Sequence, residues 1–152
     1  MRSFFSSVAS KLMRYAPVVY QIAKKHKVSP DTAFIVLATT YNDTDVLPTE
    51  EGYRVFFASR DYKLYRIDDK VFTKKQDAEK RRREVAKKLA EAILASGLRE
   101  ASSPVEVYEF LRENNVEGFK IDVADGIDDD PLVRKLFNVK KSHKDISELL
   151  SS

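Results

Sequence analysis

Residues 53–73, YRVFFASRDYKLYRIDDKVFT, are the part of the sequence that indicates the fold most clearly. They contain three short runs rich in aromatic and β-branched residues, at 53–57, 63–67 and 70–73. Such residues favour strands, and the runs are separated by residues 58–62 and by the two-residue turn Asp68-Asp69. We therefore predict a small three-stranded antiparallel sheet.

A long charged helix is expected directly after this sheet. Thr73 can cap its start, and Gly97 occupies the position at which helices commonly end. Small and aliphatic residues recur along one side and predict its buried face. On the outer face we expect ion pairs four residues apart, at Lys80–Glu84, Glu84–Lys88 and Lys87–Glu91.

A helical pair is expected before the sheet. Apolar residues at three- and four-residue spacing predict a first helix over residues 1–27, in which Pro17 either introduces a kink or starts a second helix. Ser29 then caps a second helix, and Pro30 suits its first position. This second helix is apolar nearly all round, which predicts a central buried helix. Residues 42–45 end it, and a loop through Pro48 leads to the sheet.

The remaining residues predict a smaller acidic segment. Ser103-Pro104 opens a short helix, residues 119–123 are a candidate fourth strand, and a last helix starts near Pro131. We therefore expect an α+β fold: an N-terminal helical pair, a three-stranded antiparallel sheet, a long charged helix and this segment. Residues 1–98 hold the helical pair and the β-β-β-α module, 99–139 a small α/β segment packed on it, and 140–152 a flexible tail.

The net charge of +3 hides a strong asymmetry along the chain. Residues 1–30 carry six bases and no acid, and residues 54–88 carry thirteen bases against six acids. Residues 101–152 carry seven bases against eleven acids. This distribution indicates a polyanionic partner for the basic part, or association of basic with acidic regions.

Several functional classes are disfavoured by what the sequence lacks. With no Cys there is no disulfide framework and no thiol chemistry, and no apolar run approaches the roughly 18 residues of a membrane span. The four glycines form no phosphate-binding loop, and His26 and His143 lie far apart among lysines. We therefore expect neither an enzyme nor a cofactor, and assign no catalytic residue.

One acidic cluster is a candidate cation site, made of Asp122, Asp125, Asp128, Asp129 and Asp130. Mg²⁺ and Ca²⁺ prefer several converging carboxylate oxygens. The spacing is not that of an EF-hand, and a solvated loop explains the same residues. We therefore assign no metal ligand.

Residues 22–33, IAKKHKVSPDTA, resemble the helix-turn-helix of bacterial DNA-binding proteins. Lys27 stands where that motif usually has glycine. The positions that should read bases fall on the apolar residues Phe34, Ile35 and Leu37. This favours a core helix over a recognition helix.

Residues 53–95 resemble the arm-type DNA-binding domain at the N-terminus of phage integrases. The resemblance rests on the order of three strands and a helix, and on the junction Phe72-Thr73-Lys74-Lys75-Gln76-Asp77-Ala78-Glu79. That family lays its three-stranded sheet in the DNA major groove. The resemblance therefore implies that this sheet binds DNA.

Basic side chains of the sheet and the helix start are the expected contacts, because cations neutralise backbone phosphates. They are Arg54, Arg60, Lys63, Arg66, Lys70, Lys74, Lys75, Arg81, Arg82 and Arg83. The alternative is that the three consecutive arginines only flank ion pairs on the helix. Our first hypothesis is a small non-enzymatic nucleic-acid-binding protein of viral or mobile-element origin, binding DNA rather than RNA. It would be intracellular (cytoplasmic) or part of a virion.

Two other hypotheses remain. The chain would be a structural or assembly protein, such as a virion component or adaptor, that forms homo-oligomers through its basic and acidic regions. Alternatively, it would be a metal-dependent phosphodiesterase that uses the aspartates of residues 122–130. The acid-free start of the chain also resembles a transit peptide or a membrane-surface helix.

Overall fold

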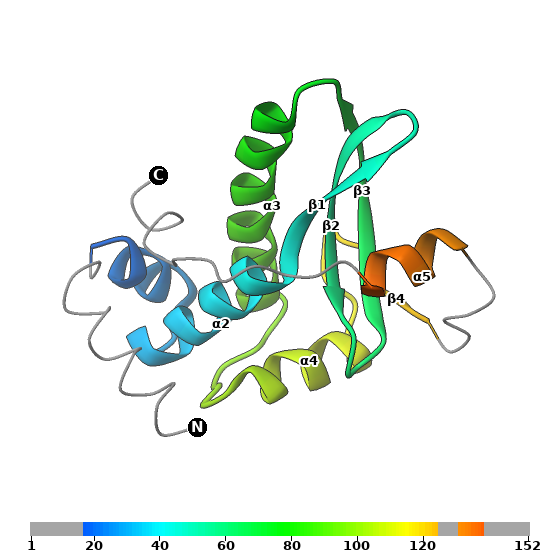
Figure 1. Ribbon diagram of the computed structural model, residues 1–152. Coiled ribbons are helices and arrows are strands. Elements are labelled where there is room, and N and C mark those ends of the chain that lie inside the picture. Colours follow the sequence, from blue (N-terminus) through cyan, green and yellow to red (C-terminus); the bar gives the residue numbers. More distant parts are fainter. Residues whose placement is uncertain (1–16, 125–130, 139–152) are drawn as a thin grey trace.

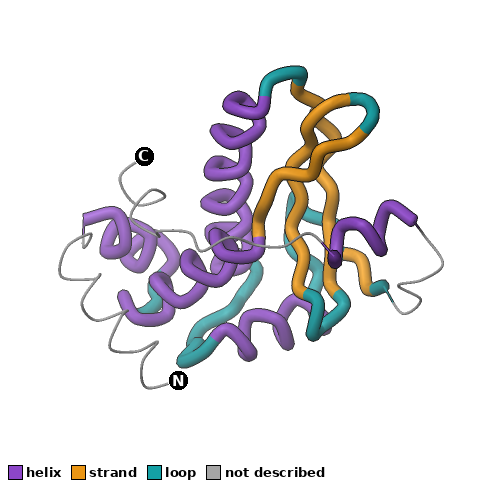
Figure 2. Tube along the Cα trace, viewed as in Figure 1, coloured by secondary structure: helices purple, strands orange, loops and turns teal. Residues whose placement is uncertain are grey.

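A computed structural model describes residues 17–124 and 131–138 of the chain (Figures 1 and 2). The fold is α+β. After a helical segment at residues 17–26, the elements are α2 (Pro30–Asp43), β1 (Thr44–Thr49), β2 (Gly52–Ser59), β3 (Leu64–Phe72), α3 (Lys75–Ala95), α4 (Pro104–Glu113), β4 (Asp122–Val123) and α5 (Pro131–Asn138). The predicted helix start at residues 1–16, the acidic residues 125–130 and the predicted tail at 140–152 lie outside the described residues.

The described sheet is antiparallel and has four strands in the order β1-β2-β3-β4. Its first strand was not predicted, because residues 44–49 were expected to form a loop. They pair with β2 from Thr44↔Phe57 to Thr49↔Gly52. Val46 is nearly buried and Leu47 fully so, so packing outweighs the turn-like composition of this stretch.

Strand β3 corrects a second prediction, since Asp68-Asp69 is not a turn. The expected second and third strands are one strand, Leu64–Phe72. The register between β2 and β3 shifts between the pairs Arg54↔Val71 and Phe56↔Ile67, so β3 carries extra residues there. The residues that resemble a turn in sequence therefore form a β-bulge.

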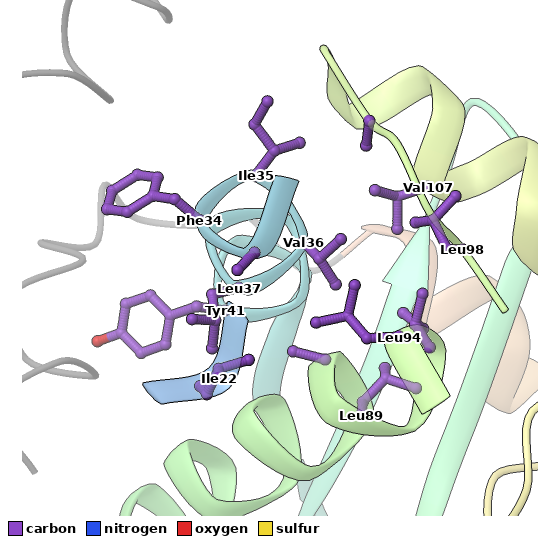
Figure 3. Close-up of a cluster of buried hydrophobic side chains, with 14 of the residues drawn as sticks. Ile22, Phe34, Ile35, Val36, Leu37, Tyr41, Leu89, Leu94, Leu98 and Val107 are labelled. Atoms are coloured by element: carbon purple, nitrogen blue, oxygen red, sulfur yellow. The ribbon is translucent and has the colours of Figure 1, made fainter. Parts of the chain in front are cut away.

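Helix α2 is the central buried helix, as predicted. Its cap is Ser29, whose side-chain oxygen accepts a hydrogen bond of 3.1 Å from the backbone N–H of Thr32. Phe34, Ile35 and Leu37 are all buried, and Figure 3 shows Leu89, Leu94 and Val107 of other elements facing one side of this helix. These three side chains pack in the core and are not available to read bases.

Two hydrophobic clusters lie on the two faces of the sheet. The larger unites α2, α3 and α4 with Phe57 and Leu64. The smaller joins Leu47 and Phe56 to the apolar face of α5. The sheet is therefore covered by helices on both faces, and α3 lies along its length (Figure 1).

Helix α3 begins later than expected. Its N-cap is Lys74, which makes no side-chain cap hydrogen bond, so the predicted cap at Thr73 is wrong. Its other end agrees with the sequence, because Ser96 caps the helix and Gly97 has a φ of +119°. Glycine adopts such a positive φ with little strain.

The C-terminal segment contributes to the same sheet. β4 pairs with the start of β3 through Leu64↔Val123 and Tyr65↔Asp122, so the predicted strand at 119–123 is shorter than expected. α4 and α5 begin at Pro104 and Pro131, near the predicted starts. Within residues 17–124 and 131–138, no helix has the length and apolar character needed to cross a membrane.

Candidate functional site

The bulge of β3 organises an ionic cluster against α3. Asp68, only 5% exposed, accepts hydrogen bonds from Arg81 Nε to Oδ2 at 2.8 Å and from Nη2 to Oδ1 at 3.3 Å. Arg66 Nη1 lies 3.8 Å from the same Oδ1. Arg54 donates from Nε and Nη2 to the backbone carbonyl of Asp68, at 3.2 and 2.8 Å. Three of the ten predicted contact residues therefore converge on one buried aspartate.

The electrostatics of this cluster favour the charged carboxylate. Burial alone would raise the pKa of Asp68, but the hydrogen bonds from Arg81 and the positive charges of Arg81 and Arg66 outweigh it. The pKa of Asp68 is therefore held below its usual value of 3.8. Glu84 also lies 3.6 Å from Arg81, so two carboxylates balance Arg81 and Arg66, and the third guanidinium group, Arg54, leaves the cluster with one positive charge.

Two open hollows adjoin this cluster, one beside each guanidinium that binds the carboxylate. The first has a volume of about 290 Å³ and is lined by Lys70, Phe72, Asp77, Lys80, Arg81 and Glu84. The second, of about 480 Å³, is lined by Arg66, Asn115, Val116, Gly118, Phe119 and Lys120. The ionic cluster therefore links two concave parts of the surface.

The junction between β3 and α3 is strongly basic. Lys70, Lys74 and Lys75 are exposed, and they form no ion pair with any residue that the structure describes. Lys74 and Lys75 lie at the N-terminus of α3, where the helix dipole already places partial positive charge, and Lys70 lies near the end of β3. These positive charges repel one another, and a bound anion would reduce that repulsion. The junction is therefore a favourable place for an anion to bind.

The acids of α3 do not neutralise its outer lysines. Glu79 bonds Arg82 at 2.8 Å, Glu84 lies 3.6 Å from Arg81, and Glu91 bonds Lys25 at 3.1 Å. The predicted pairs Lys80–Glu84, Glu84–Lys88 and Lys87–Glu91 are therefore not the ones formed among the described residues. One face of the helix thus presents Lys80, Arg83 and Lys87, together with Glu84.

The ten predicted contact residues do not form one surface. Arg82 is 4% exposed, lies 4.8 Å from the centre of the Tyr41 ring and bonds Glu79, so it is part of the core. Arg60 and Lys63 belong to the β2–β3 turn, at the opposite end of the sheet from the β3–α3 junction (Figure 1). They are about 20 Å along the strand from Lys70.

We define the β3–α3 basic surface as the exposed bases of the junction and the exposed or half-buried bases on the outer face of α3, together with the two arginines held by Asp68. Its residues are Lys70, Lys74, Lys75, Lys80, Arg83, Lys87, Arg66 and Arg81. The sequence did not identify Lys80 and Lys87 as contacts, because both were expected to pair with glutamates. It also gave no signal for Phe119 and Asn115, which line a hollow only through the fold.

The acidic cluster receives no support as a metal site from the described residues. Among residues 17–124 and 131–138 there is no group of three or more His, Cys, Asp or Glu side chains that could hold a metal ion. Asp122 is described, and its carboxylate lies 3.9 Å from Lys120 Nζ. Asp125 and Asp128 to Asp130 lie outside the described part of the chain.

Comparison with known proteins adds no family to this picture. No protein-family model, no curated protein and no solved structure matches the chain. The likeness of residues 53–95 to an arm-type DNA-binding domain thus stays a prediction from sequence.

Proposed function

We propose that this chain is a small non-enzymatic nucleic-acid-binding protein whose β3–α3 basic surface contacts the sugar–phosphate backbone. The observation that carries the proposal is the distribution of ion pairs. The acids of α3 pair with Arg81, Arg82 and Lys25, whereas the exposed lysines of the surface pair with no described residue. Cations left in this way are available to neutralise phosphates.

The spacing of the bases suits a chain of phosphates. An α-helix rises 1.5 Å per residue, so Lys80 and Lys87 are about 10 Å apart along α3, and Lys74 and Lys87 about 20 Å apart. One face of the helix can thus meet several phosphates of one strand or both strands of a duplex. Backbone contacts of this kind position a nucleic acid and carry no sequence information of their own. We therefore expect the protein to bind nucleic acids with an affinity that depends little on base sequence.

Charge-reversal variants distinguish binding through this surface from a general effect of the protein's net charge. The double variant Lys74→Glu/Lys75→Glu removes two bases from the junction, and both positions are exposed. The variant Arg60→Glu/Lys63→Glu makes the same change in charge at the opposite end of the sheet, and is the matched control. Fluorescence anisotropy with a labelled duplex at 0.1 M salt measures both.

We expect the junction variant to bind about 50-fold more weakly or worse, because each lost phosphate contact costs about a factor of eight at this salt concentration. The control should lose much less. Equal losses of duplex affinity in the two variants would refute the proposal that this surface binds nucleic acid. Absence of saturable binding by the wild type would refute the proposed function. Thermal melting should show both variants folded.

Duplex DNA, duplex RNA and single strands are compared in the same assay. We propose duplex DNA as the preferred duplex, in line with the sequence resemblance. The deep, narrow major groove of A-form RNA presents phosphates in a different arrangement from B-DNA. Tighter binding of duplex RNA at equal salt would reverse this preference while leaving the basic surface in place.

A further inference from the structure

A turn at residues 116–119 places Phe119 in the lining of two hollows. The backbone N–H of Phe119 donates to the carbonyl of Val116 at 3.0 Å, and Gly118 has a φ of +81°. This φ is the one required at the third position of a type II turn, which favours glycine. Phe119 lines both the hollow of about 480 Å³ and another of about 230 Å³.

Arg66 covers the ring of Phe119. Its guanidinium carbon lies 4.9 Å from the ring centroid, and its Nη1 lies 3.8 Å from Asp68. The guanidinium is thus restrained by the ring and by the carboxylate, and it also lines the larger hollow. An arginine stacked on an aromatic ring is a preorganised platform for a further planar group.

The polar groups around this platform match the other parts of a nucleotide. The Lys120 side chain is 89% exposed and can approach a phosphate. Asn115 is exposed and lines both hollows, and its amide offers donors and an acceptor to a base edge. Ring, guanidinium, amide and ammonium groups therefore surround one concave site.

We propose that this site binds an unpaired base of a single-stranded nucleic acid, stacked on the Arg66–Phe119 pair. The inference rests on the proposed function, since the site adjoins the β3–α3 basic surface through the shared aspartate. A strand following that surface would bring its bases to the hollow. A base inside a duplex is stacked on its neighbours and cannot enter it.

The test compares two labelled probes of equal length and charge, an oligothymidylate 12-mer and an abasic phosphodiester 12-mer. The full chain should bind the oligothymidylate about tenfold more tightly, because stacking of a base on an aromatic side chain contributes on this order. Phe119→Leu should abolish the difference and leave abasic and duplex binding unchanged. Phe110→Leu, at another half-buried phenylalanine that lines neither hollow, is the matched control.

A second variant does not depend on the packing of Phe119. Asn115→Met places a longer side chain without an aromatic ring at an exposed position and should narrow the hollow, so it also removes the preference for bases. Equal affinity of the wild type for the two 12-mers, with a steep salt dependence, would overturn the stacking site and leave the basic surface intact. If neither 12-mer binds while the duplex still binds, the stacking site is overturned and the basic surface remains; if the duplex also fails to bind, the proposed function is overturned.

Discussion

The ionic cluster around Asp68 should be a major contributor to stability, and Asp68→Asn tests this. The substitution keeps the shape of the side chain but removes its charge, and it turns one oxygen that accepts from Arg81 into a donor. Two hydrogen bonds to a charged group and the attraction to Arg66 are lost or weakened. Breaking a fully buried ion pair costs about 3–5 kcal/mol. The Arg81 and Arg66 side chains are 17% and 21% exposed, so we expect solvent to reduce this to about 2–3 kcal/mol.

Urea unfolding at pH 7 measures this loss, and for a domain of this size it corresponds to a fall in Tm of about 5–10 °C. The matched control is Asp69→Asn, which changes an exposed neighbouring carboxylate and should stay within about 0.5 kcal/mol of the wild type. If the two variants unfold at the same midpoint, the cluster does not stabilise the fold.

The pH dependence of this difference has a definite sign. The pKa of Asp68 is lower in the folded protein than its usual 3.8. Its contribution is therefore complete above the unfolded pKa and is lost as the pH falls through the folded pKa. The gap between wild type and Asp68→Asn should be full at pH 5–7 and should narrow as the pH falls below 3.8.

Three further substitutions test local parts of the fold. Ser29→Ala removes the cap of α2 and should cost about 1 kcal/mol in urea unfolding. Gly52→Ala should cost more than about 1 kcal/mol, because the φ is +140° and the new Cβ would lie 2.6 Å from the carbonyl oxygen of Phe72; an unchanged midpoint would show that the hairpin adjusts freely. Tyr108→Phe removes a hydrogen-bond donor to buried Asp43 and should cost about 1–2 kcal/mol, and a more stable variant would contradict that role.

Helices were the more predictable part of this fold, because their signals are local. Helix ends are marked by the backbone and side-chain preferences of Ser29, Pro30 and Gly97. In the structure these residues lie at the predicted helix ends. The apolar character of α2 also predicted its burial. By contrast, β1 has a turn-like composition, and it becomes a strand only because β2 and the core lie beside it.

The candidate site was less predictable, because it depends on contacts distant in sequence. In sequence, the bulge at Asp68 resembles a turn. In the structure, Arg54 donates a hydrogen bond to its backbone carbonyl and Arg81 donates one to its carboxylate. Arg82 lies beside Arg81 in sequence but points into the core, and nothing in a run of arginines distinguishes the two. Basic composition predicted a charged region, whereas the ion pairs decide which bases stay exposed.

Phosphate binding by the β3–α3 basic surface is tested by the salt dependence of binding to a labelled DNA duplex. If the four exposed lysines, Lys70, Lys74, Lys75 and Lys80, each neutralise a phosphate, a plot of log K against log salt should be linear, with a slope of about −4. In Lys74→Glu/Lys75→Glu the slope should become shallower by about 2. A wild-type slope shallower than about −1, or no saturable binding at low salt, would contradict the account.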